Sequence, residues 1–377
     1  MNHVHVCLVS DQPIPNLTTV FQFQPDTVLL LYTDESKEKK DRLKAILRKY
    51  NKKVDERLIL PFDMQNVIEV CEGVLKDYAD AEVSLNITCG TKISILGAFQ
   101  VFYSADKQIW YVNTDGQQLQ QLSPEIKEIP ISTKIKIRDY LAANGFEITD
   151  WQKDDQVILK RRELTEFLAD IAVRKDYLIG EINYVVPDAE APDLKLPKYI
   201  DFPKTPEMEE LARLLEQHGM AKRADEHCIS VDDKNVLLYL KGFWFEEYVY
   251  TLAKGIDADE VLLNVTGTWD TKGKKPPINE FDVMIAKGTQ LALISCKTSN
   301  PNRAVKGEAE GVGKEYLYEL DSLGDKALGL FGKRMLASAR NIDNQYVKDR
   351  AKVMRIEIVD GKNIRTLKDK LKSWLAR

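Results

Sequence analysis

A chain of 377 residues is too long for one ordinary domain, and a composition of 44% hydrophobic and 30% charged residues is that of a folded globular protein. The net charge of −5 neither indicates nor excludes a nucleic-acid partner, because a basic groove can lie within an acidic protein. The apolar runs are too short to span a bilayer and no leader pattern opens the chain, so we expect a cytoplasmic protein without a membrane partner.

Residues 1–140 alternate short apolar strands with amphipathic helices. The expected strands are Val4–Val9, Thr27–Tyr32, Arg57–Leu60, Glu82–Ile87 and Gln108–Asn113. Apolar residues at helical spacing lie between them, for example Leu43, Ile46, Leu47 and Tyr50. This β-α-β-α order predicts an α/β fold in which helices cover a mostly parallel sheet, as in a Rossmann fold.

Residues 141–232 are rich in charges and helix formers, which predicts a linking region with a small helical or winged-helix subdomain. Residues 233–377 begin a third pattern, in which a long helix from Asn235 to about Ala253 precedes a strand and a glycine- and lysine-rich loop. A second α/β domain is expected there. Its predicted strands are Glu260–Val265, the hairpin arms Glu280–Ile285 and Gln290–Cys296, and a late strand Val353–Ile358.

Two loops of the first domain carry polar side chains where an open parallel sheet binds its ligands, beyond the carboxyl ends of the strands. One follows the strand Val4–Val9, and the other follows Glu82–Ile87 and leads directly into a helix. The residues expected to contact a ligand are Ser10, Asp11, Gln12, Pro13, Ile14, Asn16, Thr88, Gly90, Thr91 and Lys92.

The second loop suits a phosphate group. Gly90 lets the backbone approach a ligand closely, the start of the helix offers free N–H groups, and Lys92 adds a positive charge. The loop has too few glycines for a Walker A or GxGxxG motif, which argues against a Rossmann enzyme that hydrolyses ATP or binds NAD. The same residues also fit an ordinary helix that Thr88 or Thr91 caps.

The hairpin of the C-terminal domain predicts a metal-dependent nuclease site of the PD-(D/E)xK type. Glu280 and Asp282 share one face of its first arm, and the short turn brings them beside Lys297 at the end of the second. Adjacent helix residues cannot both face the sheet, so we expect Glu246 rather than Glu247 to add a further carboxylate. The expected catalytic residues are therefore Glu246, Glu280, Asp282 and Lys297.

Hydrolysis of a phosphodiester calls for a hard cation, for which oxygen ligands are suited. The carboxylates of Asp282, Glu246 and Glu280 and the carbonyl of Cys296 are the expected ligands of Mn²⁺ or Mg²⁺, and Lys297 would orient water or stabilise the transition state. A zinc site is not indicated, because the cysteines form no CxxC pair and the histidines no HExxH spacing. A solvated hairpin rim would give the same short pattern of acids and lysine.

Taken together, these motifs resemble the CARF-domain ancillary nucleases of type III CRISPR systems, which join one CARF domain to one PD-(D/E)xK nuclease domain. The resemblance covers almost the whole chain, least clearly residues 145–230. Its motifs are the two loops, Gly242-x-Trp244-x-Glu246, Glu280-x-Asp282, Ser295-Cys296-Lys297-Thr298 and the segment Gly329–Arg334.

The resemblance implies a Rossmann-like CARF sensor domain over residues 1–140 and a restriction-endonuclease-like domain over 233–377. It implies that cyclic tetra-adenylate binds the two loops across a homodimer, whose two-fold symmetry suits this ligand. Binding would then activate an endonuclease that cuts DNA or RNA in antiviral defence, through coupling between distant sites.

One position departs from the family pattern. Ser295 stands two residues before Lys297, where the motif has Glu or Asp, and a serine is a poorer metal ligand. Glu280 or Glu246 would have to supply the missing acid. The alternative is a catalytically weak or inactive sensor that binds the cyclic nucleotide and signals to nucleic acid or a partner through residues 135–230.

Overall fold

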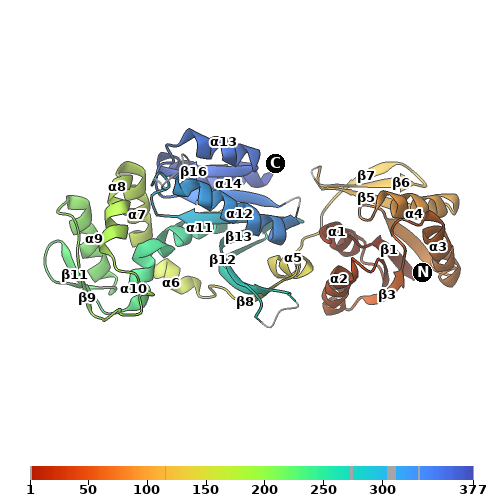
Figure 1. The fold of residues 1–377 in the computed structure, drawn as a ribbon, viewed down its shortest axis with the longest axis horizontal. Coiled ribbons are helices and arrows are strands. Elements are labelled where there is room, and N and C mark those ends of the chain that lie inside the picture. Colours follow the sequence, from red (N-terminus) through yellow and green to blue (C-terminus); the bar gives the residue numbers. More distant parts are fainter. Residues whose placement is uncertain (1, 115, 272–274, 304–310, 330–331, 377) are drawn as a thin grey trace.

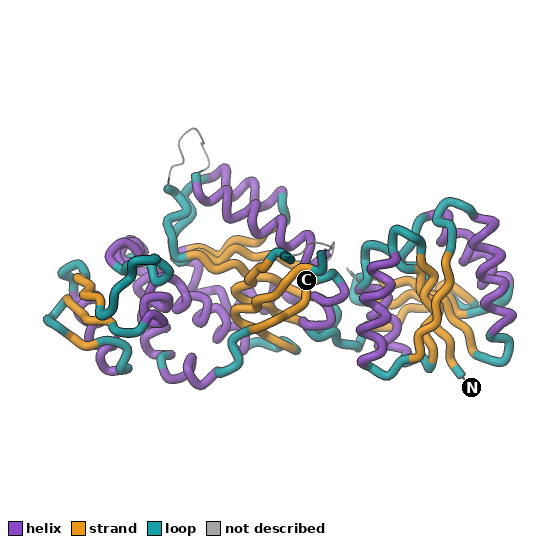
Figure 2. The backbone as a smooth tube through the Cα atoms, turned by 60° about the horizontal axis from the view of Figure 1, so that its bottom comes forward, coloured by secondary structure: helices purple, strands orange, loops and turns teal. Residues whose placement is uncertain are grey.

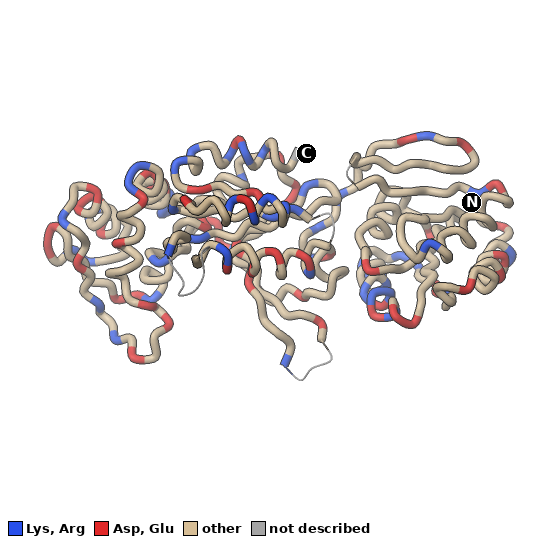
Figure 3. The backbone as a smooth tube through the Cα atoms, turned by 45° about the horizontal axis from the view of Figure 1, so that its top comes forward, with Lys and Arg blue, Asp and Glu red and all other residues tan. Residues whose placement is uncertain are grey.

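The computed structural model describes residues 2–114, 116–271, 275–303, 311–329 and 332–376. They form an elongated molecule with two α/β parts and a smaller subdomain at one end (Figure 1). Charged residues of both signs are distributed over all three parts (Figure 3). A helix with the length and apolar character needed to cross a bilayer is not found among these residues.

In the described residues, the N-terminal part is a sheet of seven strands in the order β3-β2-β1-β4-β5-β6-β7, of which the first five run parallel. Its elements are β1 (His3–Leu8), α1 (Ile14–Phe23), β2 (Thr27–Tyr32), α2 (Lys37–Lys49), β3 (Lys53–Leu58), α3 (Met64–Asp77), β4 (Glu82–Asn86), α4 (Lys92–Ser104), β5 (Gln108–Asn113), β6 (Gln118–Ser123) and β7 (Lys127–Pro130).

Alternating side chains explain why helices cover both faces of this sheet (Figure 2). Val6 packs with α3 and α4, whereas its neighbour Cys7 packs with α1 and α2. The predicted parallel α/β fold is confirmed. The predicted strand Arg57–Leu60 is displaced, since β3 begins at Lys53; this edge strand is charged and half-exposed, so it lacks the apolar run that identifies a buried strand.

The second α/β part contains a sheet in the order β16-β15-β14-β13-β12-β8, in which β8, β12, β13 and β14 are antiparallel and β14, β15 and β16 parallel. Its elements are α5 (Ile137–Ala143), β8 (Phe146–Asp150), α10 (Lys234–Leu238), a π-helical turn (Tyr239–Phe243), α11 (Trp244–Lys254), β12 (Glu260–Trp269), β13 (Ile278–Lys287), β14 (Gln290–Lys297), α12 (Val312–Leu328), β15 (Lys333–Ser338), α13 (Gln345–Val353), β16 (Ile356–Asp360) and α14 (Leu367–Ala376).

Three details of this part differ from the sequence-based predictions. The helix expected from Asn235 to Ala253 is interrupted by the π-helical turn, within which Gly242 leaves helical geometry. The late strand β16 begins at Ile356 rather than Val353, because α13 extends to Val353. The strand β8 comes from the segment expected to be a linker and pairs with β12 at the sheet edge.

The remaining segment forms a subdomain of helices and a small antiparallel sheet of order β10-β11-β9. Its elements are α6 (Asp155–Lys160), α7 (Arg162–Arg174), α8 (Asp176–Val185), β9 (Lys198–Asp201), α9 (Pro206–Gln217), β10 (Lys222–Arg223) and β11 (Cys228–Val231). Its helices share one hydrophobic cluster with α11, β13 and β14, for example through Leu168, Trp244 and Ile294. The subdomain is thus packed on the second α/β part, and the exact boundaries 141–232 stay a prediction.

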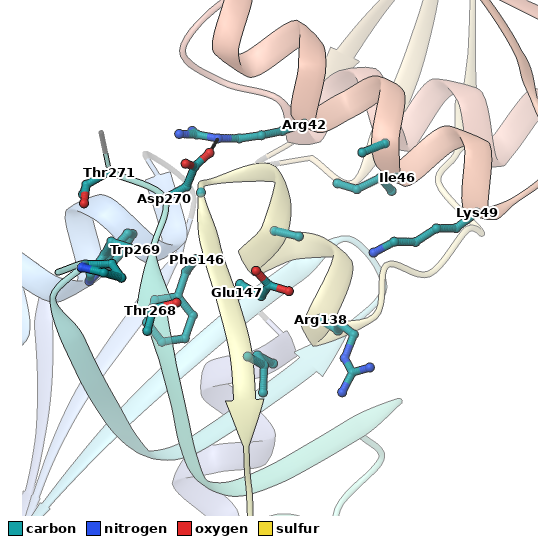
Figure 4. Close-up of a pocket in the computed structure, with 15 residues that line it drawn as sticks. Arg42, Ile46, Lys49, Arg138, Phe146, Glu147, Thr268, Trp269, Asp270 and Thr271 are labelled. Carbon is teal, nitrogen blue, oxygen red and sulfur yellow. Dashed lines mark hydrogen bonds and ion pairs between the residues drawn. The ribbon is translucent and has the colours of Figure 1, made fainter. Parts of the chain in front are cut away.

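The two α/β parts meet at α5 and at the carboxyl end of α12. One hydrophobic cluster includes Leu17 of α1, Leu141 of α5 and Leu328 of α12. The buried Tyr140 hydroxyl donates a hydrogen bond to the Leu328 carbonyl at 2.9 Å. A pocket of about 460 Å³ opens beside this junction, where Arg42 of α2 contacts Asp270 after β12 at 3.2 Å (Figure 4).

Candidate functional site

The hairpin of β13 and β14 brings Asp282 beside the end of β14. Val283 lies opposite Ile294 in the antiparallel register, so Asp282 is the next residue toward the open end. The backbone N–H of Cys296 donates to Asp282 Oδ2 at 2.6 Å, and the Ser295 hydroxyl donates to the same oxygen at 3.4 Å. These two donors fix the direction of the Asp282 carboxylate.

The first turn of α11 contributes Glu246, which lines a cleft together with Cys296 and Lys297. Its neighbour Glu247 points the other way, where the Arg161 guanidinium binds it with Nε 3.0 Å from one carboxylate oxygen. The structure therefore turns Glu246 toward the hairpin and leaves Glu247 in a buried ion pair within the subdomain contact.

Burial and like charge act together on these carboxyl groups. Burial, followed by the charges of Asp282 and Glu280, raises the pKa of Glu246 well above its usual range. Burial also raises the pKa of Asp282, although Lys297 and the N–H of Cys296 act in the opposite direction. Burial and mutual repulsion both disfavour the ionised forms of Glu246 and Asp282. A cation bound beside them would offset this repulsion and would therefore be stabilised.

Glu280 lies further out, at the rim of the hairpin. Its side chain is exposed, and it lines a cavity of about 30 Å³ with Asp282, Ser295, Lys297 and Glu319. Partial desolvation and the charge of Asp282 raise the pKa of Glu280, a shift that solvent screens because the group is exposed.

Lys297 is held between acids and an aromatic ring. Its Nζ lies 3.4 Å from a carboxylate oxygen of Glu319 and 5.5 Å from the centre of the Tyr316 ring. Burial acts to lower the pKa of Lys297, but the charges of Asp282 and Glu319 outweigh it and raise the pKa. Lys297 therefore remains a cation at neutral pH.

Glu319 belongs to this site but was not predicted from the sequence. It lies on α12, 22 residues after Lys297, so no short spacing motif includes it. The charged face of an amphipathic helix is ordinarily solvated, and Glu319 looks like any other residue of such a face.

The cleft beside Glu246 and Lys297 has a volume of about 750 Å³ and lies between α8 and the end of β14. Tyr177 and Tyr184 of α8 form one wall and are 54% and 86% exposed. Arg303 and Arg340 also line this cleft, and the Arg340 guanidinium lies 3.5 Å from an Asp176 carboxylate oxygen. An aromatic wall with cationic groups beside two catalytic candidates is chemically suited to a nucleic-acid strand.

A hydrogen-bonded bridge ties α8 to the hairpin. The Asn183 side-chain amide donates to the Thr298 carbonyl at 2.9 Å, and Lys241 Nζ donates to the Asn183 carbonyl at 2.7 Å. The Thr298 hydroxyl donates in turn to the Lys241 carbonyl at 2.8 Å. The wall of the cleft is thereby fixed relative to Lys297.

The fit of a metal ion to this site is partial. Among the residues that the structure describes, no three Asp, Glu, His or Cys side chains form a complete ligand set. Asp282 and Glu246 nevertheless offer two carboxylates that interact electrostatically, and Mg²⁺ sites often combine one or two carboxylates with water and substrate phosphate. These two residues fit a hard cation, whereas Glu280 and the carbonyl of Cys296 stay predicted ligands.

The two loops of the N-terminal part lie together, because β1 and β4 are parallel neighbours with Val6 opposite Leu85. The Cys89 thiol donates to the Gln12 carbonyl at 3.1 Å, which joins the loops directly. Gly90 is required in the second loop, since its φ is +114° and an added Cβ would lie 3.0 Å from the Ser94 hydroxyl oxygen.

Several residues predicted to bind a ligand shape these loops from within. Pro13, Ile14 and Asn16 are buried, and the Asn16 amide donates to the Leu8 carbonyl at 2.9 Å. The Thr88 hydroxyl donates to Asn86 at 2.6 Å, and Thr91 caps α4 by accepting the N–H of Ser94 at 3.1 Å. Lys92 is exposed at the start of α4, and its contact with a ligand stays a prediction.

A cavity of about 310 Å³ opens at these loops and is lined by Ser10, Asp11, Gly90 and Thr91. Lys39 of α2 also lines it and forms an ion pair with Asp11. Lys39 was not predicted, because it lies on a helix among other charged residues and outside both loops. It adds a positive charge where the loop residues offer hydroxyls and backbone N–H groups.

Comparison with known families identifies both parts of the chain. Residues 4–140 match the Card1 CARF domain, and residues 233–377 match the Card1-like endonuclease domain. The chain belongs to the Card1-like CARF nucleases. The predicted family and the predicted pairing of domains are thus confirmed, and no functionally curated protein matches the sequence. The segment Gly329–Arg334, cited for the resemblance, includes Leu330 and Phe331, which lie outside the described residues.

Solved structures resemble this CARF nuclease over most or nearly all of its length. Can2 from Sulfobacillus thermosulfidooxidans, in complex with cyclic tetra-adenylate, is 25% identical with a TM-score of 0.80 and 99% of each chain covered. Protein VC1899 from Vibrio cholerae is 21% identical with a TM-score of 0.86, covering 99% of this chain and 98% of that one. A type III CRISPR defence DNA nuclease activated by cyclic oligoadenylate is 17% identical with a TM-score of 0.56, covering 89% and 45%.

Proposed function

We propose that this protein is a metal-dependent endonuclease that cyclic tetra-adenylate activates in CRISPR antiviral defence. The observation that carries the proposal is the grouping of Glu246 and Lys297 at one cleft of a Card1-like endonuclease domain, where the charges of Asp282 and Lys297 act on Glu246. The likeness to Can2, which is bound to cyclic tetra-adenylate, supports the choice of activator.

The activator would bind the two loops of the CARF domain. Its phosphates suit the N-terminus of α4, where free N–H groups follow Gly90, and the positive charges of Lys39 and Lys92. The ion pair between Lys39 and Asp11 would open to admit a phosphate, because the anion competes with the carboxylate for the ammonium group.

A second copy of the chain would cover an apolar face beside these loops. The face joins the end of β3 to α4, and the Thr91 hydroxyl donates to the Pro61 carbonyl within it, so it is continuous with the ligand loops. Its exposed members are Leu58, Leu60, Phe62, Met64, Leu96 and Tyr103, of which Phe62 is 77% exposed. A two-fold axis here would bring two copies of each loop to one symmetric ligand.

The catalytic roles follow from charge and position. Lys297 remains protonated and would bind the scissile phosphate, stabilising the negative charge that develops in the transition state. Asp282 and Glu246 would hold Mn²⁺ or Mg²⁺, with Glu280 nearby. The bound ion would supply a Lewis acid and lower the pKa of water.

The substrate would be DNA or RNA lying along the cleft. Tyr184 and Tyr177 offer aromatic faces on which bases stack, and such stacking tolerates any base. Arg303 and Arg340 would contact phosphates, because guanidinium groups match phosphate oxygens.

One cleavage assay tests the proposal. Supercoiled plasmid, single-stranded DNA and RNA are incubated with the full chain and Mn²⁺ or Mg²⁺, with and without cyclic tetra-adenylate. We expect cleavage that requires both ligand and metal and that Lys297→Ala or Asp282→Ala abolishes. Lys287→Ala is the matched control, since Lys287 lies at the opposite end of the same hairpin and pairs with Asp257.

The alternative function gives a different result in the same assay. A sensor that signals without catalysis would bind cyclic tetra-adenylate tightly and cut no substrate under any metal condition. Ser295 is the feature that favours it, because the motif acid is absent at that position. Ligand binding without cleavage would therefore replace the nuclease proposal with this one.

A further inference from the structure

The missing acid of this active site has a source outside the hairpin. We propose that Glu319 of α12 supplies the carboxylate that Ser295 does not provide beside Asp282 and Lys297. The inference rests on the proposed metal-dependent nuclease function and names a residue for it that the sequence motif does not contain.

The position of α12 directs Glu319 into the site. Tyr316 and Glu319 are one helical turn apart and lie on the same face, which packs toward the end of β14. The Tyr316 ring lies 5.5 Å from Lys297 Nζ, and its hydroxyl is 2.5 Å from the Ser299 hydroxyl. Glu319 Oε2 reaches to 3.4 Å from the same Lys297 Nζ.

Glu319 shares the small cavity with the residues that the motif does include. The cavity of about 30 Å³ is lined by Asp282, Ser295, Lys297 and Glu319, together with Glu280. Ser295 turns its hydroxyl to Asp282 at 3.4 Å and offers no negative charge there. The carboxylate of Glu319 therefore faces the place where the motif acid would be.

Glu319 fits this place better than the two acids considered from the sequence. Its charge is among those that raise the pKa of Asp282, and its Oε2 lies 3.4 Å from Lys297 Nζ. Glu246 lines the larger cleft on α11 and does not line the small cavity. Glu319 thus approaches Asp282 and Lys297 from the side that Ser295 occupies.

The side chain of Glu319 has room to change partners. It is 57% exposed, so turning from Lys297 toward Asp282 meets little obstruction, and the long flexible chain allows it. In this position, the Glu319 and Asp282 carboxylates would face one hard cation together, which completes the acid pair of the motif. Lys297 would then be released to the substrate phosphate.

The test exchanges the acid between the two positions. Four full-length variants are compared with the unaltered chain in the presence of cyclic tetra-adenylate: Glu319→Gln, Ser295→Glu, the double variant with both changes, and Glu315→Gln as a control on the same helix. Mn²⁺ affinity is measured by calorimetry, cleavage rate on the substrate cut best, and thermal unfolding confirms that each variant is folded.

We expect Glu319→Gln to weaken Mn²⁺ binding by about tenfold or more and to lower the cleavage rate, as loss of a ligand or its support does elsewhere. Glu315→Gln should change neither. The double variant should recover both quantities, because Ser295→Glu restores a carboxylate at the motif position.

Two results would overturn the inference. Unchanged Mn²⁺ affinity and cleavage in Glu319→Gln would show that the acid is not needed. Loss of cleavage with normal Mn²⁺ affinity and no recovery in the double variant would show that Glu319 only holds Lys297. Either result leaves the nuclease proposal intact if the unaltered chain cuts, whereas absence of cutting in the unaltered chain refutes that proposal itself.

Discussion

Replacing Asp282 by asparagine should stabilise the metal-free protein while abolishing cleavage. Asparagine keeps an oxygen that accepts the Cys296 N–H, which lies 2.6 Å from Asp282 Oδ2, and it removes one of the charges that raise the pKa of Glu246. Removing a neighbouring like charge lowers the pKa of Glu246 toward its usual range, and any such change in a carboxyl pKa contributes about 1.4 kcal/mol per unit to the free energy of unfolding. Because both groups retain some contact with solvent, we expect a gain of about 1–2 kcal/mol.

The pH dependence of this gain has a defined sign. When the pKa of a carboxyl group is raised in the folded state, the free energy of unfolding falls as pH rises from the ordinary pKa to the raised one, and it stays low above the raised pKa. The gain from Asp282→Asn should therefore be full at alkaline pH. It should shrink as pH falls toward the ordinary pKa of Glu246, 4.5, and disappear below that pH, because both states then bind the proton.

Chemical denaturation in a metal chelator between pH 4.5 and 8.5 measures this effect. Asp257→Asn is the matched control, because the Asp257 side chain is 98% exposed and its loss should change the free energy of unfolding little. Added Mn²⁺ should stabilise the unaltered chain more than Asp282→Asn, since the variant loses a ligand. A loss of stability in Asp282→Asn at pH 8 would refute the account of the site as two repelling buried carboxylates.

Three further substitutions test the cleft and the junction between the domains. Tyr184→Ala should raise KM for the nucleic acid several-fold while Tyr184→Phe does not, because stacking needs only the ring, and Tyr199→Ala on β9 should have no effect. Tyr140→Phe should lower the free energy of unfolding by about 1–3 kcal/mol in denaturant titrations, since a buried carbonyl at the end of α12 loses its donor. Gly329→Ala should weaken cyclic tetra-adenylate binding in calorimetry, because the new Cβ would lie 2.8 Å from the Gln12 side-chain oxygen. Gly219→Ala has a similar positive φ with open space around it and should leave that binding unchanged.

The sequence predicted those strands whose apolar pattern can be recognised within a short stretch of residues. Among the parallel strands, β2 and β5 are mostly apolar, and they have the predicted bounds Thr27–Tyr32 and Gln108–Asn113. The edge strand β8 could not be predicted, because Phe146–Asp150 buries few of its residues and pairs with β12, which lies far along the chain. Pairing of this kind depends on tertiary contacts, which a short window of sequence does not contain.

Some residues of the candidate site could likewise be predicted from a short stretch of sequence, whereas others depend on tertiary packing. Asp282 and Lys297 were predictable because a hairpin with a short turn fixes which residues meet. The sequence showed that either Glu246 or Glu247 would face the hairpin. The structure decides between them, because Arg161 binds Glu247 and Glu246 is left to face the site. Glu319 was not predictable, because its approach to Lys297 depends on how α12 packs on the sheet.

Helix α12 contacts both the proposed catalytic site and the proposed ligand loops. Glu319, near its middle, pairs with Lys297, while Gly329 at its carboxyl end faces Gln12 of the first CARF loop. The Leu328 carbonyl accepts a hydrogen bond from the Tyr140 hydroxyl, and apolar residues along the helix belong to the cluster that includes α1 and α5.

A packed helix moves as a unit, because its backbone hydrogen bonds resist local deformation. A ligand that displaces the Gln12 loop must therefore either shift α12 or lose contacts at its end, and a shift of α12 changes the distance between Glu319 and Lys297. Since coupling between two sites is reciprocal, metal or substrate bound at Glu319 would alter the affinity of the CARF loops for their ligand by the same factor.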